Sequence, residues 1–309
     1  MERRSFLKLA GVATAASVTT TAAKAQDQGK TAFVLVHGSW HGGWCWDLVS
    51  QHLNAAGHIT VAIDLPGSGL TAGIPQSFTN RPLDPAAFAT EASTQAPIGI
   101  AAYADAVIAG ADRAVAMGAT NVVAVGHSMG GVPISFAAAK APEKFQALHY
   151  LAALTPVGEK PAGAYIGLQA QQEKSKINSI VLADPAVIGA IRVDPRSTDP
   201  AYLANFKEAL AADVDDMLLA SVMHLLTPDA PAAMYGEVAA FPEAFGNIRK
   251  TFIRCLNDNT VVPETCKAIA DDMNATWPGS PTKLVDLESS HAPMFSQRQK
   301  LAELLMENA

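Results

Sequence analysis

Cysteines, charged residues and long apolar runs are all scarce in this chain. Only three cysteines occur among the 309 residues, and no two of them stand at C-x-x-C spacing, which excludes the usual cysteine-based metal motifs. Beyond the N-terminal region, no segment is apolar over the length that a transmembrane helix needs. There is no internal repeat. We therefore expect a soluble chain that binds no metal.

The charge balance argues against polyanionic partners. The chain carries 22 basic and 29 acidic residues, a formal net charge of −7, and it has no cluster of basic residues. Such a chain lacks the positive surface that attracts nucleic acid or an anionic membrane. We expect no nucleic-acid partner and no stable membrane association. Neither length nor charge specifies the oligomeric state.

The first 25 residues resemble an export signal. Residues 3–8 (RRSFLK) form a twin-arginine pattern, a weakly apolar stretch follows, and Ala23-Lys24-Ala25 is an A-x-A-type cleavage site. The pattern predicts a twin-arginine signal peptide over residues 1–25, export by the twin-arginine machinery, and a bacterial periplasmic or secreted location. The alternative is the basic N-terminus of a cytosolic protein.

Apolar runs typical of buried strands alternate with segments of helical periodicity. The runs are residues 31–36, 59–63, 121–125, 147–154, 251–256 and 282–287. Because strands that alternate with helices form a parallel sheet covered on both faces, we expect an α/β fold. Residues 73–97 predict a long loop with one short helix. Residues 155–247 have helical spacing interrupted by prolines and predict a helical cap, which leaves 26–154 and 248–309 as the core.

Residues 126–130 (GHSMG) form a G-x-S-x-G motif between a strand and a helix, an arrangement that resembles the nucleophile elbow of α/β-hydrolases. Small residues on either side of Ser128 let the backbone turn sharply and expose the hydroxyl. The next N–H, on Met129, stands at a helix N-terminus, where it stabilises a developing oxyanion. Ser128 is the predicted nucleophile.

A serine hydroxyl needs a base to remove its proton. In the α/β-hydrolase order, the acid and then the histidine follow the serine. Three histidines follow Ser128: His149 lies within a strand, His224 lies in the predicted cap, and His291 lies on a short loop after the last strand. The loop position predicts His291 as the base.

The base needs a carboxylate to hold its imidazole. Asp258 follows the strand 251–256, at the carboxyl edge of the predicted sheet, where sites of this class collect. Glu159, after the preceding strand, is the alternative. We predict Asp258 as the acid.

The turn after the first predicted strand, residues 37–44 (HGSWHGGW), is expected to supply the second oxyanion donor. Gly38 permits a close backbone approach, and the N–H of Ser39 would point at the substrate oxygen. His37 and His127 flank glycine turns and are predicted to orient or pack rather than to react. Gly38, Trp40, His41 and the cap residue His224 are candidates for the substrate pocket. Other cap residues could line the pocket or form the cap core: Tyr165, Phe206, Met217, Met223 and Met234.

The cysteines leave one question open. Cys255 falls in a predicted strand and Cys266 early in the next predicted helix, so they could form a disulfide in an oxidising compartment or remain two buried thiols. Cys45 is predicted to be a packed thiol.

These motifs together resemble the plant methylesterase and hydroxynitrile lyase family of α/β-hydrolases and its bacterial esterase relatives. The resemblance runs from about residue 31 to the C-terminus. It is strongest at residues 34–46 (VLVHGSWHGGWCW), 64–69 (DLPGSG) and 126–131 (GHSMGG), and weaker at 255–258 and 290–292. It implies an α/β-hydrolase fold and hydrolysis of small esters in an apolar pocket beneath a helical cap, with no cofactor. Relatives include methyl-ester hydrolases of plant hormones and bacterial enzymes that degrade carbamate or pyrethroid esters.

Two positions separate esterase from lyase in that family. Hydroxynitrile lyases carry a threonine where this chain has Gly38 and a lysine where it has Ala292, so the resemblance implies hydrolysis. The chain departs from the family in a longer segment at 73–97 and in extra sequence around residues 277–279.

The sequence as a whole predicts a serine hydrolase that cleaves a small, largely apolar carboxylic ester through an acyl-enzyme. Hydrolysis of an amide, carbamate or lactone on the same residues is the nearest alternative. Non-catalytic ligand binding and cofactor-independent oxygenation also remain open.

Overall fold

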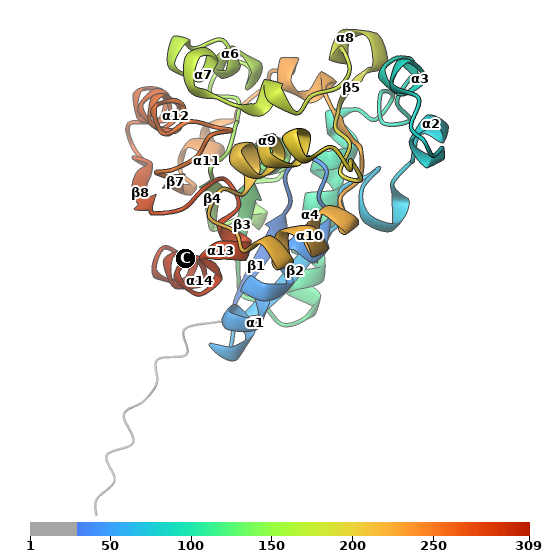
Figure 1. Ribbon diagram of the computed structural model, residues 1–309. Helices are drawn as coiled ribbons and strands as arrows, with labels where there is room; N and C mark the ends of the chain where they lie inside the picture. The colour runs from blue at the N-terminus through green and yellow to red at the C-terminus, as the bar shows by residue number, and fades with distance from the viewer. Residues whose placement is uncertain (1–29) are drawn as a thin grey trace, which may run out of the picture.

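Six parallel strands form the central sheet, in the order β2-β1-β3-β4-β7-β8 (Figure 1). A computed structural model describes residues 30–309 of the protein, so the predicted signal peptide lies outside the described residues. The strands are β1 (Thr31–Val36), β2 (Ile59–Ile63), β3 (Asn121–His127), β4 (Ala147–Leu151), β7 (Arg249–Cys255) and β8 (Lys283–Leu287). The predicted parallel sheet is therefore confirmed.

The apolar runs are continuous because the sheet is buried on both faces. Successive side chains of a strand point to opposite faces, and in β1 this sends Val34 and Val36 into one core and Phe33 and Leu35 into the other. The first core is closed by α4 (Ile100–Ala116), α5 (Gly131–Lys140) and α12 (Pro263–Thr276). The second is closed mainly by α1 (Asp47–Ala55), α13 (Pro293–Ser296) and α14 (Arg298–Glu307). In the described part of the chain, no helix combines the length and the apolarity needed to cross a membrane.

The structure departs from the sequence predictions most clearly in two places. Residues 73–97 contain two short helices rather than one, α2 (Gln76–Thr79) and α3 (Pro85–Thr90). β4 ends at Leu151 instead of residue 154, because Ala152 takes a positive φ of 45°. A residue in that conformation cannot continue an extended strand.

The interval predicted as a cap, 155–247, connects β4 to β7, and much of it lies above the sheet in Figure 1. Its helices are α6 (Gly163–Ile166), α7 (Gln169–Lys174), α8 (Pro185–Ile188), α9 (Pro200–Leu210), α10 (Asp216–Leu225) and α11 (Glu243–Gly246). It also contains an antiparallel pair that the sequence analysis did not predict, β5 (Ala190–Arg192) with β6 (Asp229–Pro231). Strands of three residues are too short to carry a visible alternation.

All three cysteines are buried free thiols. Cys255 ends β7, and Cys266 lies in α12, where its thiol donates to the carbonyl of Val261 at 3.6 Å. Of the two possibilities that the sequence left open, the structure has the free thiols.

A buried ion pair fastens β5 and β6 to the segment around α3. Arg192 and Asp229 form two parallel hydrogen bonds of 2.7 Å, and both side chains are fully buried. The same guanidinium donates to the carbonyls of Phe88 and Glu91. Removing one partner of such a pair leaves an uncompensated buried charge.

We expect Asp229→Ala to lower the free energy of unfolding by about 3–5 kcal/mol, because Arg192 would keep its charge without a counter-ion. Asp286→Ala is the matched control, since Arg254 and Asp286 make the same paired contact with the aspartate side chain 47% exposed. This exposed pair should contribute only about 0–1 kcal/mol. Urea denaturation of both variants measures the difference, and equal losses would contradict the assignment.

Candidate active site

Ser128 occupies a strained turn between β3 and α5. Its φ of 53° lies in the left-handed region, which is uncommon for a residue with a side chain and is often found at active sites. The turn is tight: a Cβ on Gly126 would lie 2.4 Å from the carbonyl oxygen of Gly130, so only glycine fits there. The carbonyl of Ser128 accepts a hydrogen bond from Leu154 N at 3.1 Å, which fixes the turn against the segment after β4. The backbone thus has the sharp geometry of a nucleophile elbow.

The loop after β1 packs directly against this turn. A Cβ on Gly38 would lie 2.9 Å from both Ser128 Cβ and His127 Nδ1, so the absence of a side chain allows the approach. Gly38 itself is not among the residues that line the cavity described below, whereas Ser39 is. Met129 is buried directly after Ser128. The two predicted oxyanion donors therefore belong to segments that meet at Ser128.

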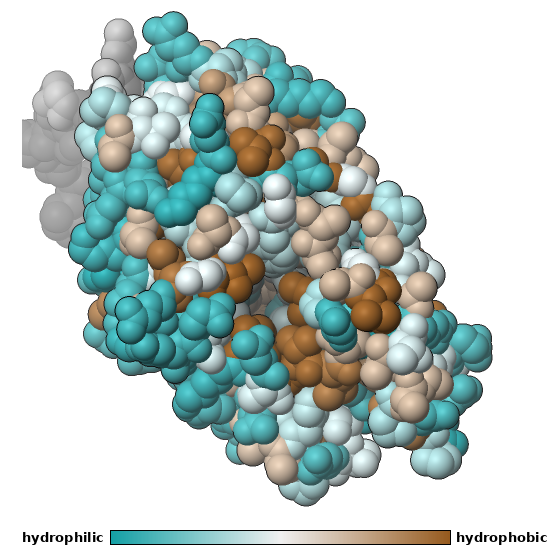
Figure 2. Space-filling model, turned by 90° about the horizontal axis from the view of Figure 1, so that it is seen from above, coloured by the Kyte–Doolittle hydropathy of each residue, from teal (hydrophilic) through white to brown (hydrophobic). Residues whose placement is uncertain are grey.

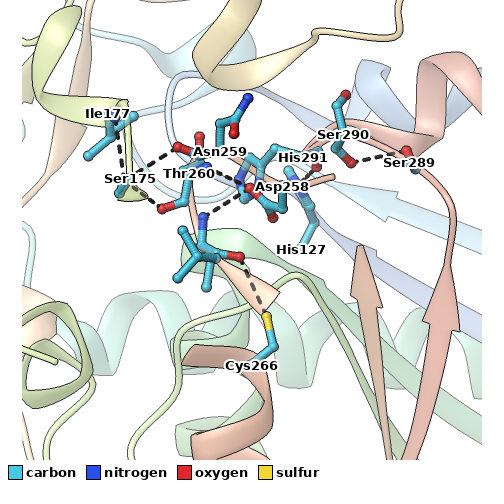
Figure 3. Close-up of polar contacts among 12 residues, drawn as sticks. His127, Ser175, Ile177, Asp258, Asn259, Thr260, Cys266, Ser289, Ser290 and His291 are labelled. Atoms are coloured by element: carbon cyan, nitrogen blue, oxygen red, sulfur yellow. Dashed lines mark hydrogen bonds and ion pairs between the residues drawn. The ribbon is translucent and has the colours of Figure 1, made fainter. Parts of the chain in front are cut away.

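His291 and Asp258 are paired. His291 lies on the loop after β8, and its Nδ1 is 2.7 Å from Asp258 Oδ2 (Figure 3). The other carboxylate oxygen, Oδ1, accepts from the backbone N–H groups of Thr260 at 2.6 Å and Val261 at 3.0 Å. Three donors hold this carboxylate in one orientation. The alternative acid, Glu159, is exposed, and no hydrogen bond joins it to His291 among the residues described.

The pairing fixes the tautomer of His291. A carboxylate oxygen accepts, so Nδ1 carries the proton, and in the neutral ring Nε2 then holds a free lone pair. His291 and Ser128 line the same cavity. Over residues 30–309, no hydrogen bond links the Ser128 hydroxyl to His291. In ligand-free enzymes such contacts are often long and tighten only in the complex.

Three further buried histidines surround the site in the neutral form. His127 Nε2 donates to the carbonyl of His291 at 2.8 Å, and His41 Nδ1 donates to the carbonyl of Ser39 at 2.7 Å. His37 accepts from Leu65 N through Nε2. Burial lowers the pKa of His41 to about 4 and holds the pKa of His127 well below its ordinary value. These rings orient the backbone of the site, as the sequence predicted for His37 and His127.

A cavity of about 280 Å³ opens beside Ser128. Seen from above, the molecule has a hollow bordered by hydrophobic residues (Figure 2). Among residues 30–309, no lysine, arginine, aspartate or glutamate lines the cavity. Its walls are Ser39, Trp40, His41, His127, Ser128, Leu154, Ile166, Gln171, Ile177, Asn178, Val181, Pro185, Ile191, Leu210, Tyr235, Thr260, Val261 and His291. Such a wall suits an uncharged, largely apolar ligand.

Trp40 and His41 lie on the cavity wall, where the sequence predicted them. The indole N–H of Trp40 donates to the carbonyl of Ile191 at 2.9 Å, which links the β1 loop to the cap strand β5. The ring of His41 stacks with Trp44 and Phe295. Both side chains therefore hold fixed positions beside Ser128.

The cap predictions were less accurate. His224 is exposed on α10 and does not line the cavity, so its predicted pocket role is wrong. The buried face of that helix is formed instead by Leu219, Val222 and Met223. Met217 on the same helix is 82% exposed. The other cap candidates are buried and do not line the cavity: Tyr165, Phe206, Met223 and Met234.

Several wall residues were missed by the sequence analysis. Gln171, Ile177 and Ile191 come from short cap elements with no motif of their own. Tyr235 lies within hydrogen-bonding reach of the Ser39 side chain, and burial raises its pKa to about 12. Across the described residues, no group of three or more histidine, cysteine, aspartate or glutamate side chains is arranged to hold a metal ion.

Curated relatives match nearly the whole chain. It is 28% identical to Methylesterase 7 of Arabidopsis thaliana over 288 residues, which cover 90% of this chain and 95% of the relative. It is 27% identical to Methylesterase 3 of the same plant, covering 92% and 98%. These relatives agree with the family resemblance seen in the motifs.

Solved structures of similar fold include a pyrethroid hydrolase from Sphingobium faniae JZ-2, with a TM-score of 0.68 and 20% identity over 90% of this chain and 96% of that one. Polyneuridine aldehyde esterase gives a TM-score of 0.66 at 18% identity, covering 90% and 98%. At these identities the likeness shows the fold alone. The predicted α/β-hydrolase fold is confirmed. Because residues 33–304 match the family model described as the alpha/beta hydrolase family, the chain belongs to that family.

Proposed function

We propose that this protein is a serine hydrolase that cleaves uncharged, largely apolar carboxylic esters through an acyl-enzyme. The observation that carries the proposal is the His291–Asp258 pair, whose histidine lines the same cavity as the strained Ser128. Relatives named methylesterase and a neighbour named pyrethroid hydrolase support ester chemistry.

In the first step, Ser128 Oγ attacks the ester carbonyl carbon while His291 Nε2 takes the hydroxyl proton. The carbonyl π electrons move onto oxygen, and the N–H groups of Ser39 and Met129 stabilise the resulting oxyanion. Asp258 stabilises the imidazolium that forms, as the carboxylate does in other serine hydrolases. The carboxylate needs little reorganisation during this step, because the N–H groups of Thr260 and Val261 already hold it in place.

In the second step, the oxyanion collapses and the bond to the leaving alcohol breaks. His291 returns its proton to the departing oxygen, which leaves an acyl group on Ser128. A water molecule then repeats the cycle: His291 removes its proton, the hydroxide adds to the acyl carbon, and the carboxylic acid departs as Ser128 recovers its proton.

The uncharged cavity predicts a preference that can be measured with a matched pair of substrates. We expect p-nitrophenyl butyrate to be hydrolysed with a kcat/KM about 100-fold higher than p-nitrophenyl hemisuccinate, because the wall offers no cation to pair with the succinyl carboxylate. The rates of hydrolysis of p-nitrophenyl esters from acetate to decanoate would then show how long an acyl chain the cavity accommodates. Equal kcat/KM values for butyrate and hemisuccinate would contradict the assignment of this cavity as the substrate site.

Further assays separate the remaining candidates. Amide, carbamate and lactone substrates use the same residues with a different leaving group, and rates on each class rank them. A folded protein that hydrolyses none of these but binds a small apolar ligand would be a non-catalytic member of the fold, and oxygen consumption would reveal an oxygenase.

Export by the twin-arginine pathway is proposed from residues 1–25 alone.

A further inference from the structure

The turn that carries Asp258 is held by the cap. Gln171, on α7, reaches two peptide groups of that turn: its Nε2 donates to the carbonyl of Thr260 at 2.6 Å, and its Oε1 accepts from Val262 N at 3.1 Å. The side chain is buried, at 5% exposure. Gln171 lies on the cavity wall, but both ends of its amide are engaged by protein backbone rather than left for a ligand.

The peptide groups that bond to Gln171 and those that bond to the Asp258 carboxylate belong to consecutive residues of the same turn. The N–H of Thr260 and the N–H of Val261 donate to Asp258 Oδ1, while the carbonyl of Thr260 and the N–H of Val262 bond to Gln171. A shift of Gln171 therefore moves the donors that orient Asp258. Asp258 in turn holds Nδ1 of His291.

Other cap contacts converge on the same turn (Figure 3). Ser175 donates to the carbonyl of Thr260 at 2.9 Å, and Lys176 N donates to the carbonyl of Asn259 at 2.7 Å. The hydroxyl of Thr260 also donates to the carbonyl of Ala209 on α9 at 2.8 Å. The turn is therefore hydrogen-bonded to α7, to the residues directly after α7 and to α9, and the side chain of Gln171 bonds to two of its peptide groups.

We propose that Gln171 is a positioning residue for the catalytic triad of Ser128, His291 and Asp258. It fixes the turn 258–262 so that the Asp258 carboxylate holds His291 in the orientation that proton transfer requires. The expected effect of Gln171 on kcat rests on the proposed function. Its expected effect on the orientation of His291 can be observed without any substrate. The buried N–H of Val262 would lose its partner if Gln171 became apolar, and the turn would have to move to satisfy it.

The test replaces Gln171 with methionine, which keeps the length of the side chain and removes both hydrogen bonds. We expect kcat for p-nitrophenyl butyrate to fall by about 10- to 100-fold, the scale of a small misplacement of a catalytic group, with KM little changed. In the substrate-free protein, the downfield proton resonance of His291 Nδ1–H should weaken or shift. That resonance is identified by its absence in His291→Asn.

Gln169→Met is the matched control, because Gln169 lies on the same helix but is exposed and bonds only to Glu173. It should keep both kcat and the downfield resonance. Gln171→Asn, whose shorter amide cannot span both peptides, is made alongside in case the methionine variant does not fold.

Two outcomes would overturn the proposal. A folded Gln171 variant with unchanged kcat and an unchanged resonance would show that the turn does not need it. A raised KM with an intact resonance would place Gln171 in substrate binding instead. If the wild-type protein hydrolyses no ester, the proposed function fails, and the resonance still decides whether Gln171 positions His291.

Discussion

Replacing Ser128 with alanine should lower kcat for a p-nitrophenyl ester by about 10⁶-fold, the scale seen when a serine protease loses its nucleophile. The expectation follows from the strained turn at Ser128, which presents a single hydroxyl to the cavity that His291 also lines. Without that hydroxyl no acyl-enzyme can form, so only background attack by water remains. Rates on p-nitrophenyl butyrate, with circular dichroism to establish folding, measure the effect.

Ser221→Ala is a suitable control, because Ser221 is exposed on α10 and donates only to the carbonyl of Met217. This variant should hydrolyse the ester as the wild type does. If the Ser128→Ala variant kept a rate close to that of the wild type, the nucleophile would have to be another residue.

Replacing Asp258 with asparagine should lower kcat by about 10⁴-fold, and the hydrogen bonds around the carboxylate explain why. The N–H groups of Thr260 and Val261 require an acceptor, so the amide oxygen of asparagine would face them. Its NH₂ group would then face His291 Nδ1 and force that nitrogen to accept. The proton would move to Nε2, which could no longer take a proton from Ser128.

Glu159→Gln tests the alternative acid directly. Glu159 is exposed in the segment after β4, so this variant should keep its full rate. A large loss in Glu159→Gln together with a small loss in Asp258→Asn would reverse the assignment. Rates for both variants on the same ester, at the pH of highest wild-type activity, decide between the two carboxylates.

The parallel sheet and the elbow could be predicted from the sequence because both depend on local patterns. β1 is apolar from Ala32 to Val36, as expected for a strand buried on both faces, and glycines bracket Ser128 where only glycine fits. The pairing of His291 with Asp258 could also be predicted, because each lies on the loop that follows a strand of a parallel sheet. The carboxyl ends of such strands meet at one edge.

The cap could not be predicted in the same way. Most positions of α10 are apolar, so the sequence does not specify which face of the helix is buried, and His224 was assigned to the pocket although it faces solvent. Which face of such a helix is buried depends on how the helix packs against elements that are distant in the sequence. Gln171 shows the same dependence, since its role arises only when α7 meets a turn about 90 residues later in the chain.

The central claim is that Ser128 is a nucleophile activated within this cavity, and covalent labelling tests it most directly. The protein is incubated with ethyl p-nitrophenyl butylphosphonate, an uncharged diester that transfers its phosphonyl group to an activated serine and releases p-nitrophenolate, and the digested product is analysed by mass spectrometry. We predict a single adduct on the peptide that contains Ser128, stoichiometric release of p-nitrophenolate, and neither in Ser128→Ala. An adduct on another residue, or none in the folded wild-type protein, would contradict the account.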